Sequence, residues 1–176
     1  QGRVLAKSSS NRNLWLQGSP DQAIECARAA DAEAAAMDHS LTLAIALIWA
    51  VTVLLWTGEL QSAEAYIDTL ISRAESHSLA PYLLIAQGLK GEIAIRHGNA
   101  NDGVEGLQSS LRNLHAAPHE LLTTELNLSL AGGLSAMGRF DEAISLIEET
   151  LTETKANGNQ LHDPELLRMK GAILVN

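Results

Sequence analysis

The sequence predicts an all-α protein, a solenoid of about four helix hairpins, each of roughly 40 residues, followed by a terminal helix. Three observations support this fold class. Alanine and leucine, which both favour helices, make up 55 of the 176 residues. Four glycines, Gly18, Gly58, Gly98 and Gly138, follow one another at a constant interval, which is the repeat period. No segment shows the apolar–polar alternation that is typical of a strand.

The residues around these glycines also repeat. Five positions after each glycine there is a small residue, at Ala23, Ala63, Gly103 and Ala143. Seven positions before the glycine, small residues recur at Gly91 and Ala131, and a partial fifth repeat has Gly171 at the same place. Small residues at these positions allow two antiparallel helices to approach closely. Because one hairpin cannot bury its apolar stripe alone, neighbouring hairpins are expected to stack.

Each hairpin has a first helix, which we name A, and a second helix, which we name B. The expected elements are, in order, 10–17 (A), 20–37 (B), 41–57 (A), 60–77 (B), 82–97 (A), 100–115 (B), 120–137 (A), 140–157 (B) and 164–175 (A). The turn glycine ends an A helix, because glycine adopts the left-handed conformation without steric cost. Polar residues after it, such as Asn99, are expected to cap the following B helix. Pro81, Pro118 and Pro164 separate the hairpins.

The array is expected over residues 13–176, preceded by a weakly ordered lead-in over residues 1–12. The chain begins with Gln1 and ends in an apolar helical phrase, so we expect it to be a fragment of a longer protein. Residues 40–58 carry no charge, but their apolar core, Leu41–Trp56, is shorter than the roughly 20 residues of a typical bilayer span. This segment is in register with the repeat, and we interpret it as a buried helix of a protein that does not enter a membrane.

The overall charge and the cysteine content narrow the function classes. A formal net charge of −9 argues against a nucleic-acid partner, since binding to phosphates requires clustered lysine and arginine. The single cysteine, Cys26, cannot form an internal disulfide. This composition suits a reducing compartment, and we expect a cytoplasmic protein.

The repeated phrases resemble the tetratricopeptide (TPR) repeat. The clearest copy is Gly138-Arg-Phe-Asp-Glu-Ala143, although the period here is longer than that of the usual TPR. Together with Gly18-Ser-Pro-Asp-Gln-Ala23 and Glu165-Leu-Leu-Arg-Met-Lys-Gly171, it resembles the C-terminal repeat region of bacterial signal-transduction ATPases, which carry a nucleotide-cyclase or a winged-helix DNA-binding domain. The resemblance implies a right-handed superhelix that acts as a protein-interaction or sensor region of a bacterial transcriptional regulator.

No catalytic, cofactor or metal site is expected. The nearest string to a phosphate-binding loop, Gly98–Gly103, is followed by Val and Glu where Lys and Ser or Thr are needed. Cys26 lies in an alanine-rich helix and is interpreted as a packing residue. His39, His77 and His115 recur at the ends of B helices, where a ring is expected to satisfy the last carbonyl groups.

The TPR resemblance implies that A helices line a concave surface on which a protein, a peptide or a small effector binds. Taking the small-residue position as reference, the candidate binding residues are Trp49, Thr52, Trp56, Ile85, Glu92, Arg96, Glu125, Leu128 and Arg168. Two interpretations stay open for several of them. Trp49 and Trp56 stand seven positions apart, which fits one face of a core helix as well as a ligand contact. Glu92 and Arg96 stand four positions apart and could simply stabilise their own helix.

A second function class is a structural or oligomerising segment of a larger signalling ATPase. The terminal helix, 164–175, lacks a B helix after it, so its apolar residues are expected to be partly uncovered. An uncovered apolar face promotes self-association, which would produce a homodimer through this helix.

Overall fold

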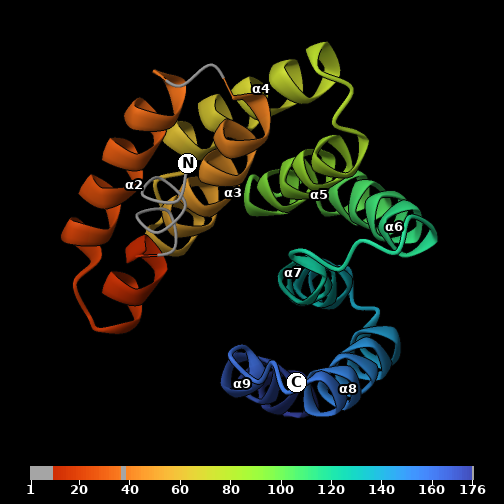
Figure 1. The fold of residues 1–176 in the computed structure, drawn as a ribbon. Coiled ribbons are helices and arrows are strands. Elements are labelled where there is room, and N and C mark those ends of the chain that lie inside the picture. Colours follow the sequence, from red (N-terminus) through yellow and green to blue (C-terminus); the bar gives the residue numbers. More distant parts are fainter. Residues whose placement is uncertain (1–9, 37–38, 176) are drawn as a thin grey trace. The chain divides into compact units, whose positions relative to one another are not determined.

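The computed structural model describes residues 10–36 and 39–175, and every regular element among them is a helix. A first helical segment covers residues 10–16. The helices that follow are α2 (Pro20–Ala35), α3 (Ser40–Thr57), α4 (Leu60–Ser76), α5 (Ala80–Arg96), α6 (Ala100–Ala116), α7 (Thr123–Ala136), α8 (Phe140–Asn157) and α9 (Asp163–Leu174) (Figure 1). The predicted helices are all present. The predicted lead-in falls mostly outside the described residues, but residues 10–12 already belong to the first helical segment.

The helix ends confirm the role of the turn glycines. Gly18, Gly58, Gly98 and Gly138 have φ between +73° and +90°, a region in which other residues are strained. At the other end of a helix two capping expectations were wrong. Asn99 makes no side-chain cap hydrogen bond to α6. His39 does not close α2: its Nδ1 accepts the backbone N–H of Thr42 at 3.2 Å and therefore caps the start of α3.

The largest difference in boundaries is at α7, which begins at Thr123 although the pattern predicted 120. Leu122 precedes it with φ +63°, a left-handed conformation that interrupts the helix. A smaller difference is at α5, which begins at Ala80 and accommodates Pro81 in its first turn. Proline is tolerated there because the N–H groups of the first turn have no partner within the helix.

The chain divides within α5 into two compact units, residues 1–86 and 87–176. In the N-terminal unit, α3 packs against both α2 and α4 (Figure 1). In the part of the chain that the structure describes, α3 is the one helix long and apolar enough to cross a membrane, and 67% of its residues are buried within the protein. Leu47, Ile48 and Leu54 are almost completely buried. The uncharged segment therefore forms the core of this unit, as the repeat register predicted.

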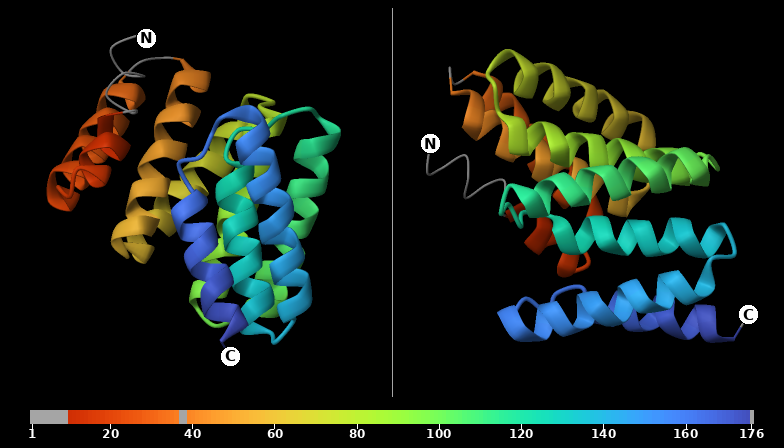
Figure 2. Two further views of the ribbon diagram at one scale, coloured as in Figure 1. Left: turned by 90° about the horizontal axis from the view of Figure 1, so that it is seen from below. Right: turned by 90° about the vertical axis from the view of Figure 1, so that its right-hand side faces the viewer.

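In the C-terminal unit, α6, α7, α8 and α9 run antiparallel to their neighbours in sequence (Figure 2). Two glycines face each other where α5 crosses α6. A Cβ placed on Gly103 would lie 2.5 Å from the carbonyl oxygen of Gly91, and one placed on Gly91 would lie 2.9 Å from that of Gly103. These distances are shorter than a van der Waals contact, so the two helices meet backbone to backbone. The small-residue positions thus serve the close approach that the repeat pattern indicates.

Candidate partner-binding surfaces

In the N-terminal unit, three tryptophans and an arginine form a cluster on the A helices. The rings of Trp15 and Trp56 have their centroids 4.6 Å apart. The guanidinium of Arg12 lies 4.5 Å from the centroid of Trp49 and 5.5 Å from that of Trp56. These distances are typical of aromatic and cation–π contacts. We name Arg12, Trp15, Trp49 and Trp56 the tryptophan cluster.

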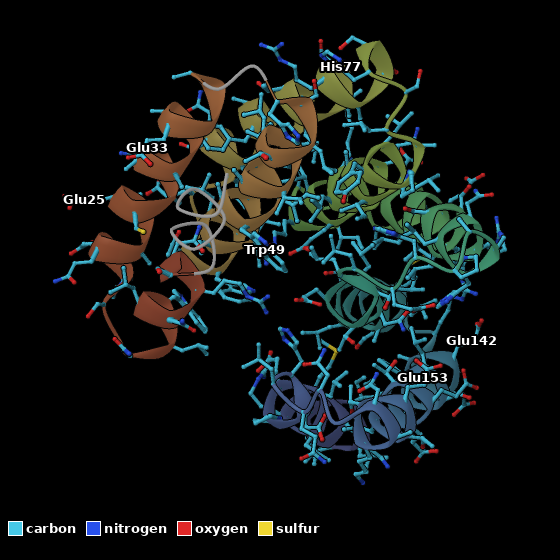
Figure 3. The ribbon with its side chains drawn as sticks, viewed as in Figure 1. Glu25, Glu33, Trp49, His77, Glu142 and Glu153 are labelled. Atoms are coloured by element: carbon cyan, nitrogen blue, oxygen red, sulfur yellow. The ribbon has the colours of Figure 1, made fainter. Side chains whose placement is uncertain are left out.

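The cluster combines packing and exposure. All four side chains have intermediate burial, so each keeps part of its surface in contact with solvent. Figure 3 shows Trp49 projecting from α3. The two interpretations of Trp49 and Trp56 therefore both apply: the rings hold adjacent A helices together and still present an aromatic surface.

Two other candidates lie in the core. Thr52 is 3% exposed, and its hydroxyl donates a hydrogen bond to the carbonyl oxygen of Ile48 at 2.9 Å. Ile85 is 0% exposed. Because neither side chain offers surface to a partner, we remove both from the candidate face. Both residues stand at repeat positions that were expected to face the binding surface. In α3 and α5, however, the apolar stripe that packs into the core is wide enough to include these positions.

In the C-terminal unit the equivalent face carries a polar network. Glu92 accepts hydrogen bonds from Arg96, with its Oε1 2.7 Å from a terminal guanidinium nitrogen, and from the hydroxyl of Ser129 at 2.8 Å. The Glu92 side chain is 12% exposed. The pair therefore does more than support its own helix, because the carboxylate also bridges α5 to α7.

The network continues from α7 to the start of α9. Ser129 also donates to the backbone carbonyl of Glu125 at 3.1 Å. The Glu125 carboxylate lies 3.1 Å from Nε2 of His162, and the two side chains are 15% and 9% exposed. The residue after this histidine, Asp163, accepts a hydrogen bond from Thr154 at 2.7 Å. The start of α9 is thus hydrogen-bonded to α8 and lies against the Glu125 carboxylate of α7.

The last two candidates are more open. Leu128 has intermediate burial on α7. The Arg168 side chain is 65% exposed and pairs with Glu165, with nitrogen and oxygen 2.6 Å apart. Hydrogen bonding within this pair, with a smaller contribution from charge, lowers the pKa of Glu165 against the effect of desolvation. Of the charged candidates, Arg168 is the one that presents most of its side chain to solvent.

Sequence reasoning missed Arg12, Trp15, Ser129 and His162. Arg12 was detectable, since it stands one repeat period before Thr52 and two before Glu92 and so shares their repeat position. Ser129 was detectable in the same way, since it stands two repeat periods after Trp49. Trp15 falls at a position that the other A helices use differently, and His162 belongs to a connection. The roles of these two residues depend on tertiary packing and have no signal in the repeat.

The B helices present a different surface. Glu25 and Glu33 on α2, and Glu142 and Glu153 on α8, point away from the neighbouring helices of their units (Figure 3). Among the described residues, no three histidine, cysteine, aspartate or glutamate side chains gather in a way that could hold a metal ion.

Comparison with known proteins shows the fold. No family model and no curated protein sequence matches the chain. The apo form of RapI superposes with a TM-score of 0.69 at 8% identity, over 96% of this chain and 63% of RapI. A putative kinesin light chain from Podospora anserina with nearly identical TPR-like repeats gives a TM-score of 0.63 at 18% identity, over 98% and 95% of the two chains. Its Q17M form gives the same TM-score and identity, over 97% and 94%.

These likenesses confirm that the chain has a TPR-like helical repeat fold, as the glycine and alanine positions predicted. At 8% and 18% identity they show the fold alone. The chain spans 63% of the length of RapI.

Proposed function

We propose that this chain is a non-catalytic protein-interaction module of a larger bacterial regulatory protein, and that its A helices bind a peptide or protein segment. The proposal is supported by the TPR-like fold and, above all, by the partly exposed tryptophan cluster. The resemblance of the repeat phrases to signal-transduction ATPases supports a cytoplasmic regulator, with a cyclase-like or winged-helix output domain, as the parent. A small effector is the alternative class of ligand for the same surface.

The tryptophan cluster has the properties of a binding hot spot. Tryptophan and arginine are enriched among the residues that contribute most to protein–protein affinity. A tryptophan ring supplies a large apolar area and loses little conformational entropy on binding, since only two torsions are fixed. Mutual packing of Trp15, Trp49, Trp56 and Arg12 already restrains these torsions. A partner would therefore meet a preorganised surface.

The test uses peptides selected from a random library on the folded chain. The protein has three tryptophans, and all three belong to the cluster. Intrinsic fluorescence therefore reports on this surface directly. We expect selected peptides to change the emission on binding, and Trp49→Ala to weaken binding by about tenfold or more.

The matched control is Phe140→Ala, which removes an aromatic side chain that is 40% exposed on α8. This variant should bind the selected peptides with unchanged affinity. Equal affinities of the wild type and Trp49→Ala, with both folded by circular dichroism, would contradict a binding role for the cluster. Failure to select any peptide, combined with unchanged emission in the presence of small-molecule libraries, would contradict the module itself.

The second candidate function is a structural or oligomerising segment with no ligand of its own. It is favoured by the exposure of Leu167 and Leu174 on α9, which are 57% and 63% exposed. Light scattering over a range of concentrations tests it. A dimer that dissociates in Leu174→Glu would support this function, and a monomer at high concentration would contradict it.

A further inference from the structure

Two tryptophan rings of α3 already hold a cation, the guanidinium of Arg12. Trp49 and Trp56 stand seven positions apart on α3, so they lie on one face of the helix and about 10.5 Å apart along its axis. The central carbon of the guanidinium lies 4.5 Å from the ring centroid of Trp49 and 5.5 Å from that of Trp56. One cation is therefore in contact with both rings. We name this place, formed by the rings of Trp49 and Trp56, the cation site.

The charge around the cation site favours a positive ligand. The helix that carries the two rings has no charged residue, and the face of an indole ring is the negative part of its quadrupole. Apart from Arg12, residues 10–86 include nine acidic residues and two basic ones. The N-terminal unit as a whole therefore attracts an approaching cation and repels an anion.

The segment that supplies Arg12 is short and docks at a cost. It covers residues 10–16, and a helix of this length is not stable by itself in water. Asn11 opposes its docking: the side chain is 0% exposed, and its amide nitrogen and oxygen make no hydrogen bond to any described residue. A buried amide without a partner destabilises the docked state, because both atoms would be hydrogen-bonded in water. Release of the segment removes this penalty.

We propose that Trp49 and Trp56 bind the side chain of an arginine in the partner segment, and that Arg12 occupies the same place as an internal competitor until the partner arrives. This inference rests on the proposed peptide-binding function and names the chemistry of its ligand. Exchange of one guanidinium for another preserves the cation–π contacts at the rings. The exchange also returns the amide of Asn11 to water. The planar guanidinium stacks on an indole face better than the ammonium of lysine does.

Two matched peptides test the charge of the ligand. One is a tripeptide with a central arginine and blocked ends, and the other has citrulline, a neutral side chain of nearly the same shape, in its place. Nuclear magnetic resonance of the isotope-labelled protein follows the indole N–H signals of the three tryptophans, all of which belong to the cluster. We expect the arginine peptide to shift the signals of Trp49 and Trp56 and to bind about fivefold or more tightly than the citrulline peptide. Equal binding of the two peptides would overturn the proposal.

Two adjacent residues test the internal competition, with opposite expected signs. Arg12→Ala empties the cation site, so the arginine peptide should bind at least about threefold more tightly to this variant than to the wild type. Asn11→Leu removes the buried amide and stabilises the docked segment, so the same peptide should bind at least about threefold more weakly. Because Asn11→Leu is expected to stabilise the protein, it tests the competition even if Arg12→Ala does not fold. Unchanged affinity in the folded Asn11→Leu variant would overturn the proposal.

The matched control for Arg12→Ala is Arg28→Ala, which removes an exposed arginine from α2. It changes the net charge by the same amount and should leave the affinity for the arginine peptide unchanged. If both variants raised the affinity equally, attraction by the net charge would explain the effect and the proposal would be wrong. A tripeptide with a central glutamate that bound more tightly than the arginine peptide would also overturn it, because Arg12 would then be the group that receives the ligand.

Peptides selected from a library separate this inference from the proposed function. Selected peptides that shift the tryptophan signals, but lose no affinity when their arginines are replaced by citrulline, would overturn the inference and leave the peptide-binding function in place. Failure to select any peptide, together with a preference for the arginine tripeptide, would contradict the function and support the chemistry of the cation site. The two proposals can therefore fail or hold independently.

Discussion

The A helices of the two units have the same repeat register but hold together by different chemistry. In the N-terminal unit the inward positions of the first helical segment and of α3 carry Arg12, Trp49 and Trp56, joined by aromatic and cation–π contacts. In the C-terminal unit α5 and α7 are joined by the carboxylate of Glu92 and the hydroxyl of Ser129. The backbone repeat therefore fixes where the side chains lie, and the residue type at each position determines which interaction forms there.

One repeat position makes the comparison direct. Thr52 and Glu92 are one repeat period apart and occupy the same position in successive A helices. Thr52 is satisfied by its own helix through Ile48. Glu92 is satisfied by its own helix through Arg96 and by the next A helix through Ser129. The same position is thus self-contained in one unit and bridging in the other. A binding surface can change along the array without any change of fold.

The largest expected effect concerns the crossing of α5 and α6. Gly103→Ala would place a Cβ 2.5 Å from the carbonyl oxygen of Gly91 and 2.5 Å from Cγ1 of Ile95. The helices must separate, and we expect the free energy of unfolding to fall by about 2 kcal/mol. The equivalent residue of the N-terminal unit is already alanine, Ala63. Chemical denaturation with urea measures the change.

The control is Gly106→Ala on the same helix. Its added Cβ would meet only Cα of Gly91, at 3.8 Å, which is an ordinary contact. Alanine has the higher helix propensity, so this variant should gain up to about 1 kcal/mol. If Gly103→Ala were as stable as Gly106→Ala, the backbone contact would not limit the crossing, and the register argument for the small residues would be wrong.

The next effect compares Glu92 with Thr52. Glu92→Ala leaves Ser129 without its acceptor on α5 and removes the anchor of Arg96. We expect a loss of about 1–2 kcal/mol in the free energy of unfolding. Thr52→Val removes a hydroxyl that bonds only within its own turn, and should cost less than about 0.5 kcal/mol.

A double-mutant cycle separates bridging from local support. Glu92→Ala and Ser129→Ala should show a coupling free energy of about 0.5–1 kcal/mol, because they share one hydrogen bond between two helices. Additive effects would mean that Glu92 acts only within α5. The two units would then not differ in how neighbouring A helices are joined.

The same contrast, between a repeated backbone and side chains that differ from repeat to repeat, explains how far the sequence predicts this structure. The repeat period and the small residues define the backbone, so the predicted helix ends lie close to the observed ones. The largest difference is the start of α7, which the left-handed conformation of Leu122 delays. The site was harder to predict. Thr52 and Ile85 have the correct register, but the apolar stripe around them is wide enough to bury them. Trp15 and His162 act through contacts between repeats, which single-helix patterns do not contain.

The smallest expected effect on stability is electrostatic and arises from an ion pair on α9. Glu165 accepts hydrogen bonds from Arg168 at 2.6 and 2.7 Å, which lowers the pKa of Glu165 from its usual value of 4.5. A lowered pKa contributes stability above the unfolded value, and this contribution is lost as the pH falls through the folded value. The tryptophan cluster contains no carboxylate and should show no such dependence.

We therefore expect Glu165→Gln to melt slightly below the wild type at pH 7, and the difference to shrink as the pH falls from 4.5 towards pH 3. The Glu165 side chain is 45% exposed, so solvent screens the pair, and the shift should stay within about 1 °C. Scanning calorimetry at both pH values measures it. A difference that persisted at pH 3 would point to lost packing and not to charge. In that case α9 would be held by the same kind of contact as the helices of the N-terminal unit.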